Sequence, residues 1–267
     1  LGLGLGLGLW SRLGLGLGLG FGLGLGLGVG LRLAPTASSS SRSRRRRRVF
    51  KPAALERRRP SASISARSSA EAAGAEVILG VGDYLGGTHP ADMEDRSVDD
   101  LAAEIVADVR VGIDGTGVKA GVIGEIGCTY PWLPNEKKSL RAAVAAQVET
   151  GAPLMVHPGR DPMSPVEIAE IVDAEGGDLS RTTICHIDRT CTDRSWLADL
   201  AATGCHLEYD LFGNESSWYP PNPAVDMPSD AERMDVILWH FEHGLEGQVL
   251  LSHDIATKHR LHAYGGL

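Results

Sequence analysis

The chain has 267 residues, of which 43% are hydrophobic, and it carries a formal net charge of −8 at pH 7. This length is enough for one large domain or two small ones. Its four cysteines form no Cys-x-x-Cys pair, which argues against a disulfide-stapled secreted module and favours a reducing compartment.

The overall charge averages two very different segments. Residues 1–70 hold 13 lysines and arginines but a single acid, Glu56, whereas the rest of the chain holds 13 basic and 33 acidic residues. Segments with such opposite charge do not belong to one folded unit. We therefore expect residues 1–70 to form a low-complexity, Ser/Arg-rich arm and residues 71–267 to form the folded part.

The arm has three interpretations. Residues 1–33 are almost a Leu-Gly repeat, and alternate glycines oppose a helix by about 1 kcal/mol each relative to alanine. A disordered extension or a translated simple repeat is therefore favoured, although residues 13–31 are uncharged and long enough to span a bilayer. Residues 36–70 have the Ser- and Arg-rich composition of a transit peptide, so a targeting segment ranks second and a membrane anchor third.

From residue 76 onward, apolar runs of strand length alternate with segments of helical periodicity. The predicted strands span residues 76–82, 118–125, 153–157, 182–186, 205–209 and 248–252. The predicted helices span residues 98–111, 136–150, 165–173, 193–202 and 230–243. Alternation at this pitch predicts an α/β fold whose parallel sheet is covered by helices.

Four of these apolar runs end in side chains that bind metals, namely Glu125, His157, His186 and Asp254. A charge that is buried without a partner is costly, so these side chains are not expected to be packing material. The first three lie 32 and 29 residues apart, and the fourth follows after a further 68. A barrel of about 250 residues in eight strand–helix units has a period near 30, which would place all four on its C-terminal rim.

Carboxylates and imidazoles together suit zinc, manganese, iron or cobalt rather than a thiolate site. In a two-metal scheme Glu125 bridges the ions, and His157 and His186 hold one of them. Asp254 holds the other and takes a proton as general base. A single strand-end histidine is more often a packing residue, but four such ligands in register favour a metal site.

Further polar residues follow the same strands. Tyr84, Arg160, Arg189 and Asp210 are candidates to orient a substrate, although a hydrogen bond within the loops is a slightly favoured alternative for each. Asp188 is a candidate to steer a metal-bound histidine, because outer carboxylates commonly do so.

Five segments carry a resemblance to a known family, and they span residues 124–127, 156–160, 180–190, 207–213 and 252–255. Together they resemble the phosphotriesterase-related proteins of the amidohydrolase superfamily, over about residues 74–267. This resemblance implies a TIM (β/α)8-type barrel with a binuclear, usually zinc, centre. It also implies that Glu125 takes the bridging place that a carboxylated lysine holds in other relatives.

The sequence departs from this family in two respects. The family has a His-x-His pair on its first strand, and no histidine precedes His89 here. About six strands are predicted instead of eight, so we expect an incomplete barrel that lacks the first and last strands.

These observations predict a zinc-dependent hydrolase, in which a metal-bound hydroxide attacks an ester, amide or phosphoester bond of a small substrate. Two zinc ions fill a complete site, and other divalent transition metals also fit. The alternative is a truncated, inactive gene product, and a nucleic-acid or membrane module driven by the arm ranks third. We expect a small-molecule substrate, no specific nucleic acid, no stable membrane insertion and a cytoplasmic location, with organelle targeting as the alternative.

Overall fold

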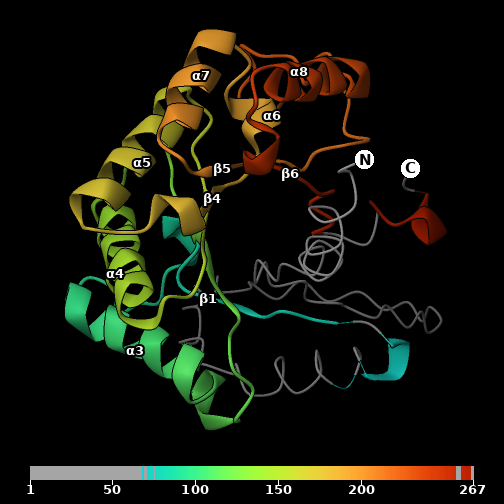
Figure 1. Ribbon diagram of the computed structural model, residues 1–267. Helices are drawn as coiled ribbons and strands as arrows, with labels where there is room; N and C mark the ends of the chain where they lie inside the picture. Colours follow the sequence, from blue (N-terminus) through green and yellow to red (C-terminus); the bar gives the residue numbers. More distant parts are fainter. Residues whose placement is uncertain (1–67, 69–70, 75, 257–259, 266–267) are drawn as a thin grey trace, which may run out of the picture.

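The computed structural model describes residues 68, 71–74, 76–256 and 260–265, so the Leu-Gly repeat and nearly all of the basic arm lie outside the described residues. Within them, six parallel strands form one sheet in the sequential order β1 to β6 (Figure 1). In a (β/α) barrel each strand likewise pairs with the next one along the chain. The predicted parallel α/β architecture is therefore confirmed.

Every predicted strand and helix is present. The strands are β1 (Gly80–Val81), β2 (Val122–Gly127), β3 (Leu154–His157), β4 (Thr182–Ile184), β5 (His206–Tyr209) and β6 (Val249–Leu251). The helices are α3 (Val98–Arg110), α4 (Pro134–Thr150), α5 (Met163–Ala174), α6 (Ile187–Thr190), α7 (Arg194–Ala202) and α8 (Asp230–Glu242). No helix in the described part of the chain is both long and apolar enough to cross a membrane.

Helices α3, α4, α5 and α7 follow one another along one face of the sheet (Figure 1). The core lies between the two layers, where Ile123, Ile126, Leu154 and Ile184 are completely buried. Removing each such side chain from water stabilises the fold by about 1.5–3 kcal/mol. The strand residues that face the helices thus stabilise the sheet by their burial. The C-terminal ends of the strands are free to carry polar groups.

In the part of the chain that the structure describes, the sheet is an incomplete barrel. Among the described residues, β1 pairs only with β2, and β6 pairs only with β5. A closed barrel of eight strands would have two further strands between β6 and β1. Leu251 of β6 accordingly keeps 49% of its surface exposed. The expected absence of the first and last strands stays a prediction.

One buried carboxylate fixes the loops beside the strand ends. Glu136, in the first turn of α4, has no exposed surface and accepts hydrogen bonds from the backbone N–H groups of Gly86 and Thr129, both at 2.9 Å. Its first-turn position also suits the positive end of the helix dipole. The loops that follow β1 and β2 are therefore tied to the start of α4.

Gly124 explains how Glu125 reaches the rim. The backbone of Gly124 has a φ of +135°, and a Cβ atom there would lie 2.3 Å from the carbonyl oxygen of Met155. Only glycine fits both the conformation and the close approach of β3. The pairing of β2 with β3 shifts register between Ile123 and Ile126, and such irregularities commonly redirect side chains next to sites.

Candidate metal centre

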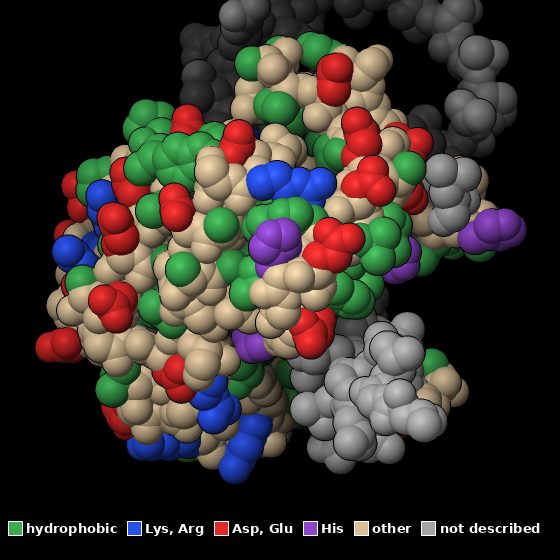
Figure 2. Space-filling model, turned by 45° about the horizontal axis from the view of Figure 1, so that its top comes forward, with side chains coloured by type: hydrophobic (Ala, Val, Ile, Leu, Met, Phe, Trp, Pro, Cys, Tyr) green, Lys and Arg blue, Asp and Glu red, His purple; other side chains and the backbone are tan. Residues whose placement is uncertain are grey.

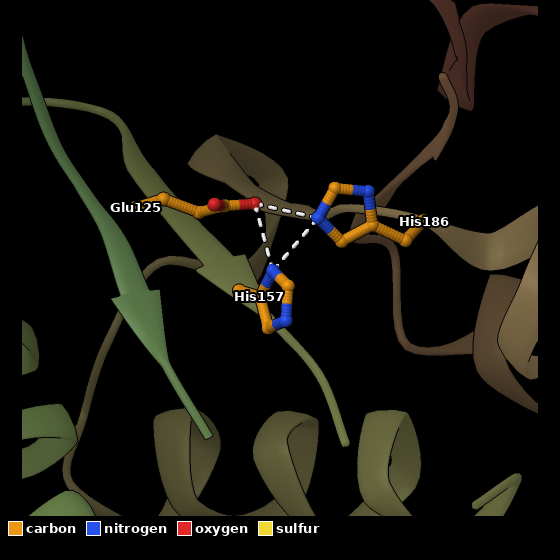
Figure 3. Close-up of side chains that lie close together, drawn as sticks. All are labelled: Glu125, His157 and His186. Carbon is orange, nitrogen blue, oxygen red and sulfur yellow. Dashed lines mark hydrogen bonds and ion pairs between the residues drawn. The ribbon is translucent and has the colours of Figure 1, made fainter. Parts of the chain in front are cut away.

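Three of the four predicted ligands converge. Glu125 lies in β2, His157 is the last residue of β3, and His186 follows β4, and Figure 3 shows their side chains pointing toward one another. Oε1 of Glu125 is 2.9 Å from Nε2 of His186 and 3.4 Å from Nδ1 of His157. The two imidazole nitrogens are themselves 2.8 Å apart. Three ligand atoms thus surround one point.

The electrostatics of these three side chains are coupled. Burial would raise the pKa of Glu125, but the neighbouring imidazoles of His186 and His157 outweigh it and hold that pKa well below its usual range. Burial lowers the pKa of His157 to about 4, so this imidazole is neutral near pH 7. Burial would also lower the pKa of His186, but Asp210 and Glu125 raise it well above its ordinary value.

This donor set fits a divalent metal. One carboxylate and two imidazoles are typical zinc ligands, and a metal requires them in their deprotonated forms. Glu125 and His157 already meet that condition, whereas the raised pKa of His186 favours its protonated form. Metal binding is therefore expected to release a proton from His186.

Asp210 holds His186 from the other side. It lies directly after β5, and its carboxylate oxygens are 2.8 Å from Nδ1 of His186. A carboxylate in this place fixes the ring orientation and directs Nε2 toward Glu125. Asp188, the carboxylate that the sequence pointed to for this role, instead accepts hydrogen bonds from Nε of Arg233 and the N–H of Leu211.

We expect Asp210→Asn to weaken zinc binding by about 10–100-fold, because the amide no longer carries the charge that supports His186. Competition with a chromophoric chelator measures the change. Asp199→Asn on the exposed surface of α7 is the matched control and should bind zinc as the wild type does. An unchanged zinc affinity in Asp210→Asn would rule out the orienting role.

The other predicted residues lie around this centre. The hydroxyl of Tyr84 is 3.0 Å from Nδ1 of His157. Arg189 is buried beside the same ring, with Nη2 3.3 Å from Nε2 of His157. Nε of Arg160 donates to the hydroxyl of Tyr219 at 3.2 Å, and the carbonyl of Arg160 accepts from Asn222.

Asp254 follows β6 but is not one of the three converging ligands. Its carboxylate pairs with Arg260 at 3.2 Å, and its φ of 40° lies in the left-handed region that few non-glycine residues adopt. Burial raises its pKa, the charge of His186 lowers it, and the charges of Asp210 and Glu125 raise it further. Asp254 therefore belongs to the same electrostatic environment, and its role as ligand and base stays a prediction.

A second cluster of possible ligands includes Asp210, the partner of His186. Cys185, Glu208 and Asp210 are buried, with potential ligand atoms within 4.8 Å of one another. Burial raises the pKa of the Cys185 thiol well above its ordinary value and that of Glu208 to about 8, so both are protonated at neutral pH and poor ligands. The alternation of polar side chains at residues 206, 208 and 210 indicates this inward face, and Glu208 was not among the predicted site residues.

Comparisons with known proteins identify the family of the chain. The model of the phosphotriesterase family matches residues 57–267. The chain belongs to the phosphotriesterase family. The predicted resemblance is therefore confirmed.

The curated relatives include a phosphotriesterase-related protein of Nematostella vectensis, 50% identical over 190 residues, which cover 71% of this chain and 54% of the relative. An N-acetyltaurine hydrolase of Bos taurus is 43% identical over 197 residues, which cover 74% of this chain and 56% of that relative. This phosphotriesterase-family chain thus spans about half the length of the curated relatives it matches.

Two solved structures show the same fold. A resiniferatoxin-binding protein from Rhodobacter sphaeroides is 39% identical with a TM-score of 0.72, and the match covers 76% of this chain and 56% of that one. A phosphotriesterase homology protein from Escherichia coli, complexed with phosphate in its active site, is 30% identical with a TM-score of 0.65. The match covers 75% of this chain and 65% of that one.

Proposed function

We propose that this phosphotriesterase-family chain forms the metal site of a zinc-dependent hydrolase that cleaves the amide bond of a small N-acyl compound such as N-acetyltaurine. The observation that carries the proposal is the convergence of Glu125, His157 and His186 at the ends of adjacent strands (Figure 3). Relatives named N-acetyltaurine hydrolase support an amide substrate over an ester or a phosphoester.

Glu125, His157 and His186 would hold the zinc, which would polarise the substrate carbonyl and make a water molecule acidic enough to attack it. The neutral His157 offers its Nδ1 lone pair, and Asp210 keeps Nε2 of His186 directed toward Glu125. These four side chains are buried or half-buried, so the charges act on the reacting groups with little screening by water.

Asp254 is the proposed general base. Its raised pKa suits proton transfer, because a base works best when its pKa approaches the working pH. The carboxylate would accept a proton from the attacking water and pass it to the leaving amine. The pairing with Arg260 keeps Asp254 on the rim.

The proposal is tested with the purified chain, stripped of metal and then titrated with zinc, while acetate release from N-acetyltaurine is followed. We expect turnover that requires zinc, and a loss of about 100-fold or more in kcat for Asp254→Asn, consistent with the usual contribution of a general base. A chain that binds zinc but hydrolyses neither N-acetyltaurine, a lactone nor a phosphotriester would support the inactive gene product instead.

A further inference from the structure

Arg189 is a buried cation whose partners are neutral. Its side chain lies in α6 with 5% of the residue exposed. Nη1 donates to the hydroxyl of Thr190 at 2.8 Å, and Nη2 donates to the carbonyl of Pro158 at 3.3 Å. Among the described residues, no carboxylate lies within 4.0 Å of this guanidinium. Buried charges are normally paired in direct contact, whereas the carboxylates of Asp210 and Glu125 act on Arg189 only from a longer range.

The guanidinium of Arg189 has more donors than its neighbours satisfy. It carries five N–H groups, of which Thr190 and Pro158 accept only two hydrogen bonds. Nη2 also lies 3.3 Å from Nε2 of His157, a ring atom that carries no negative charge.

A second arginine lies nearby. Burial lowers the pKa of Arg189, and the positive charge of Arg160 lowers it further, while Tyr84 feels the charges of both arginines. Arg160 is only half-buried, and Tyr219 and Asn222 of the loop after β5 hold its side chain and backbone. Nη2 of Arg189 contacts the carbonyl of Pro158, two residues before Arg160, so the two like charges lie beside the same loop, and an anion between them would relieve their repulsion.

The folded part of the chain carries an excess of acidic side chains. Acidic side chains are spread over the face of the molecule in Figure 2, and residues beyond 70 carry 33 acids against 13 basic residues. Diffuse attraction of anions to such a surface is not expected. An anion would bind here only through directed hydrogen bonds.

We infer that Arg160 and Arg189 bind the anionic end of the substrate, a sulfonate or carboxylate, while its acyl group lies at the metal centre. Guanidinium groups form paired, charge-assisted hydrogen bonds with planar or tetrahedral oxyanions. Tyr219 acts as a positioning residue that aims Arg160. This inference rests on the proposed amide hydrolysis and adds the class of compound that the same site accepts.

The experiment compares three probes on the zinc-loaded chain: N-acetyltaurine, N-acetyl-β-alanine and the neutral N-ethylacetamide. We expect Arg160→Gln and Arg189→Gln to lower the ratio of kcat/KM for either anion over the neutral probe by about 10–100-fold, the usual loss for a charge-assisted hydrogen bond. The loss should appear in KM. Arg141→Gln, on the exposed side of α4, is the matched control.

Zinc content and calorimetric binding of N-acetyltaurine are measured in every variant. An unchanged ratio in Arg160→Gln, with zinc retained, would overturn the anion site while the hydrolase proposal stands. If the wild type hydrolyses no probe, the hydrolase proposal fails. The calorimetric binding of N-acetyltaurine then tests the anion site on its own. Binding at least tenfold weaker in Arg160→Gln than in Arg141→Gln would support the anion site, and equal or absent binding would overturn it. Arg160 is half-buried, so its substitution tests the idea even if Arg189→Gln does not fold.

Discussion

Replacing Glu125 by glutamine is expected to abolish zinc binding and turnover together. The amide keeps the shape of the side chain but removes the only carboxylate among the three converging ligands. Loss of a residue that hydrogen-bonds to a metal ligand already weakens metal binding by about 10–100-fold. Loss of a ligand itself should therefore weaken zinc binding by more than about 100-fold. Zinc titration of the metal-free protein and acetate release from N-acetyltaurine measure the two effects.

The control for this change is Glu242→Gln, on the exposed end of α8, which should leave both quantities unaltered. Circular dichroism of Glu125→Gln should show the wild-type helix content, because Glu125 contributes to the rim and not to the core. Wild-type zinc affinity and turnover in Glu125→Gln would contradict the assignment of this residue as a ligand.

Replacing Arg233 by methionine is expected to destabilise the fold by about 3–5 kcal/mol, the usual result of leaving a buried charge without its partner. The side chains of Arg233 and Asp188 have 0% and 1% exposure, and Nε of Arg233 donates to Oδ2 of Asp188 at 2.8 Å. The same guanidinium donates to Asp230 at 2.6 Å and to the carbonyl of Asn214 at 2.8 Å. Urea unfolding measures the loss.

The effect of Arg233→Met should depend on pH. Burial already raises the pKa of Asp188 to about 6, and removing Arg233 would raise it further. A carboxyl whose pKa is raised by folding takes up a proton in the native state, so its penalty is absent at low pH and grows as pH rises. The destabilisation should therefore be larger at pH 8 than at pH 5.

Arg110→Met, at an exposed ion pair, should change stability by less than about 1 kcal/mol. The double variant Asp188→Leu with Arg233→Met should recover most of the stability, because an apolar pair often replaces a buried ion pair without loss. A single variant as stable as the wild type at pH 8 would show that the pair does not hold α8 to the rim.

The fold was largely predictable because its signals are local. Apolar runs ending at Glu125, His157 and His186 marked three strands, and Gly151, with a φ of 68°, ends α4 where the sequence predicted. The exception is β1, where a run of seven residues forms only Gly80–Val81. Among the described residues this strand has a neighbour on one side only, so fewer ladder hydrogen bonds support it.

The site was predictable only in part, because side-chain pairing depends on contacts between distant segments. The ligands could be read from strand ends, whereas the bond between His186 and Asp210 joins residues 24 apart and that between Asp188 and Arg233 joins residues 45 apart. Both carboxylates follow a strand, Asp188 within α6 after β4 and Asp210 directly after β5. The partner of each one lies in a segment that the local pattern does not identify. Arg233 on α8 pairs with Asp188, and Asp210 contacts His186, so both pairs join elements that lie far apart in the sequence.

Anomalous diffraction at the zinc absorption edge, from crystals grown with zinc, tests the central claim most directly. A peak should lie among Oε1 of Glu125, Nδ1 of His157 and Nε2 of His186, at about 2.0–2.2 Å from each atom. Loss of this peak in crystals of Glu125→Gln would show that Glu125 is a ligand of the metal. Absence of any peak there, or a peak confined to Cys185, Glu208 and Asp210, would contradict the proposed metal centre.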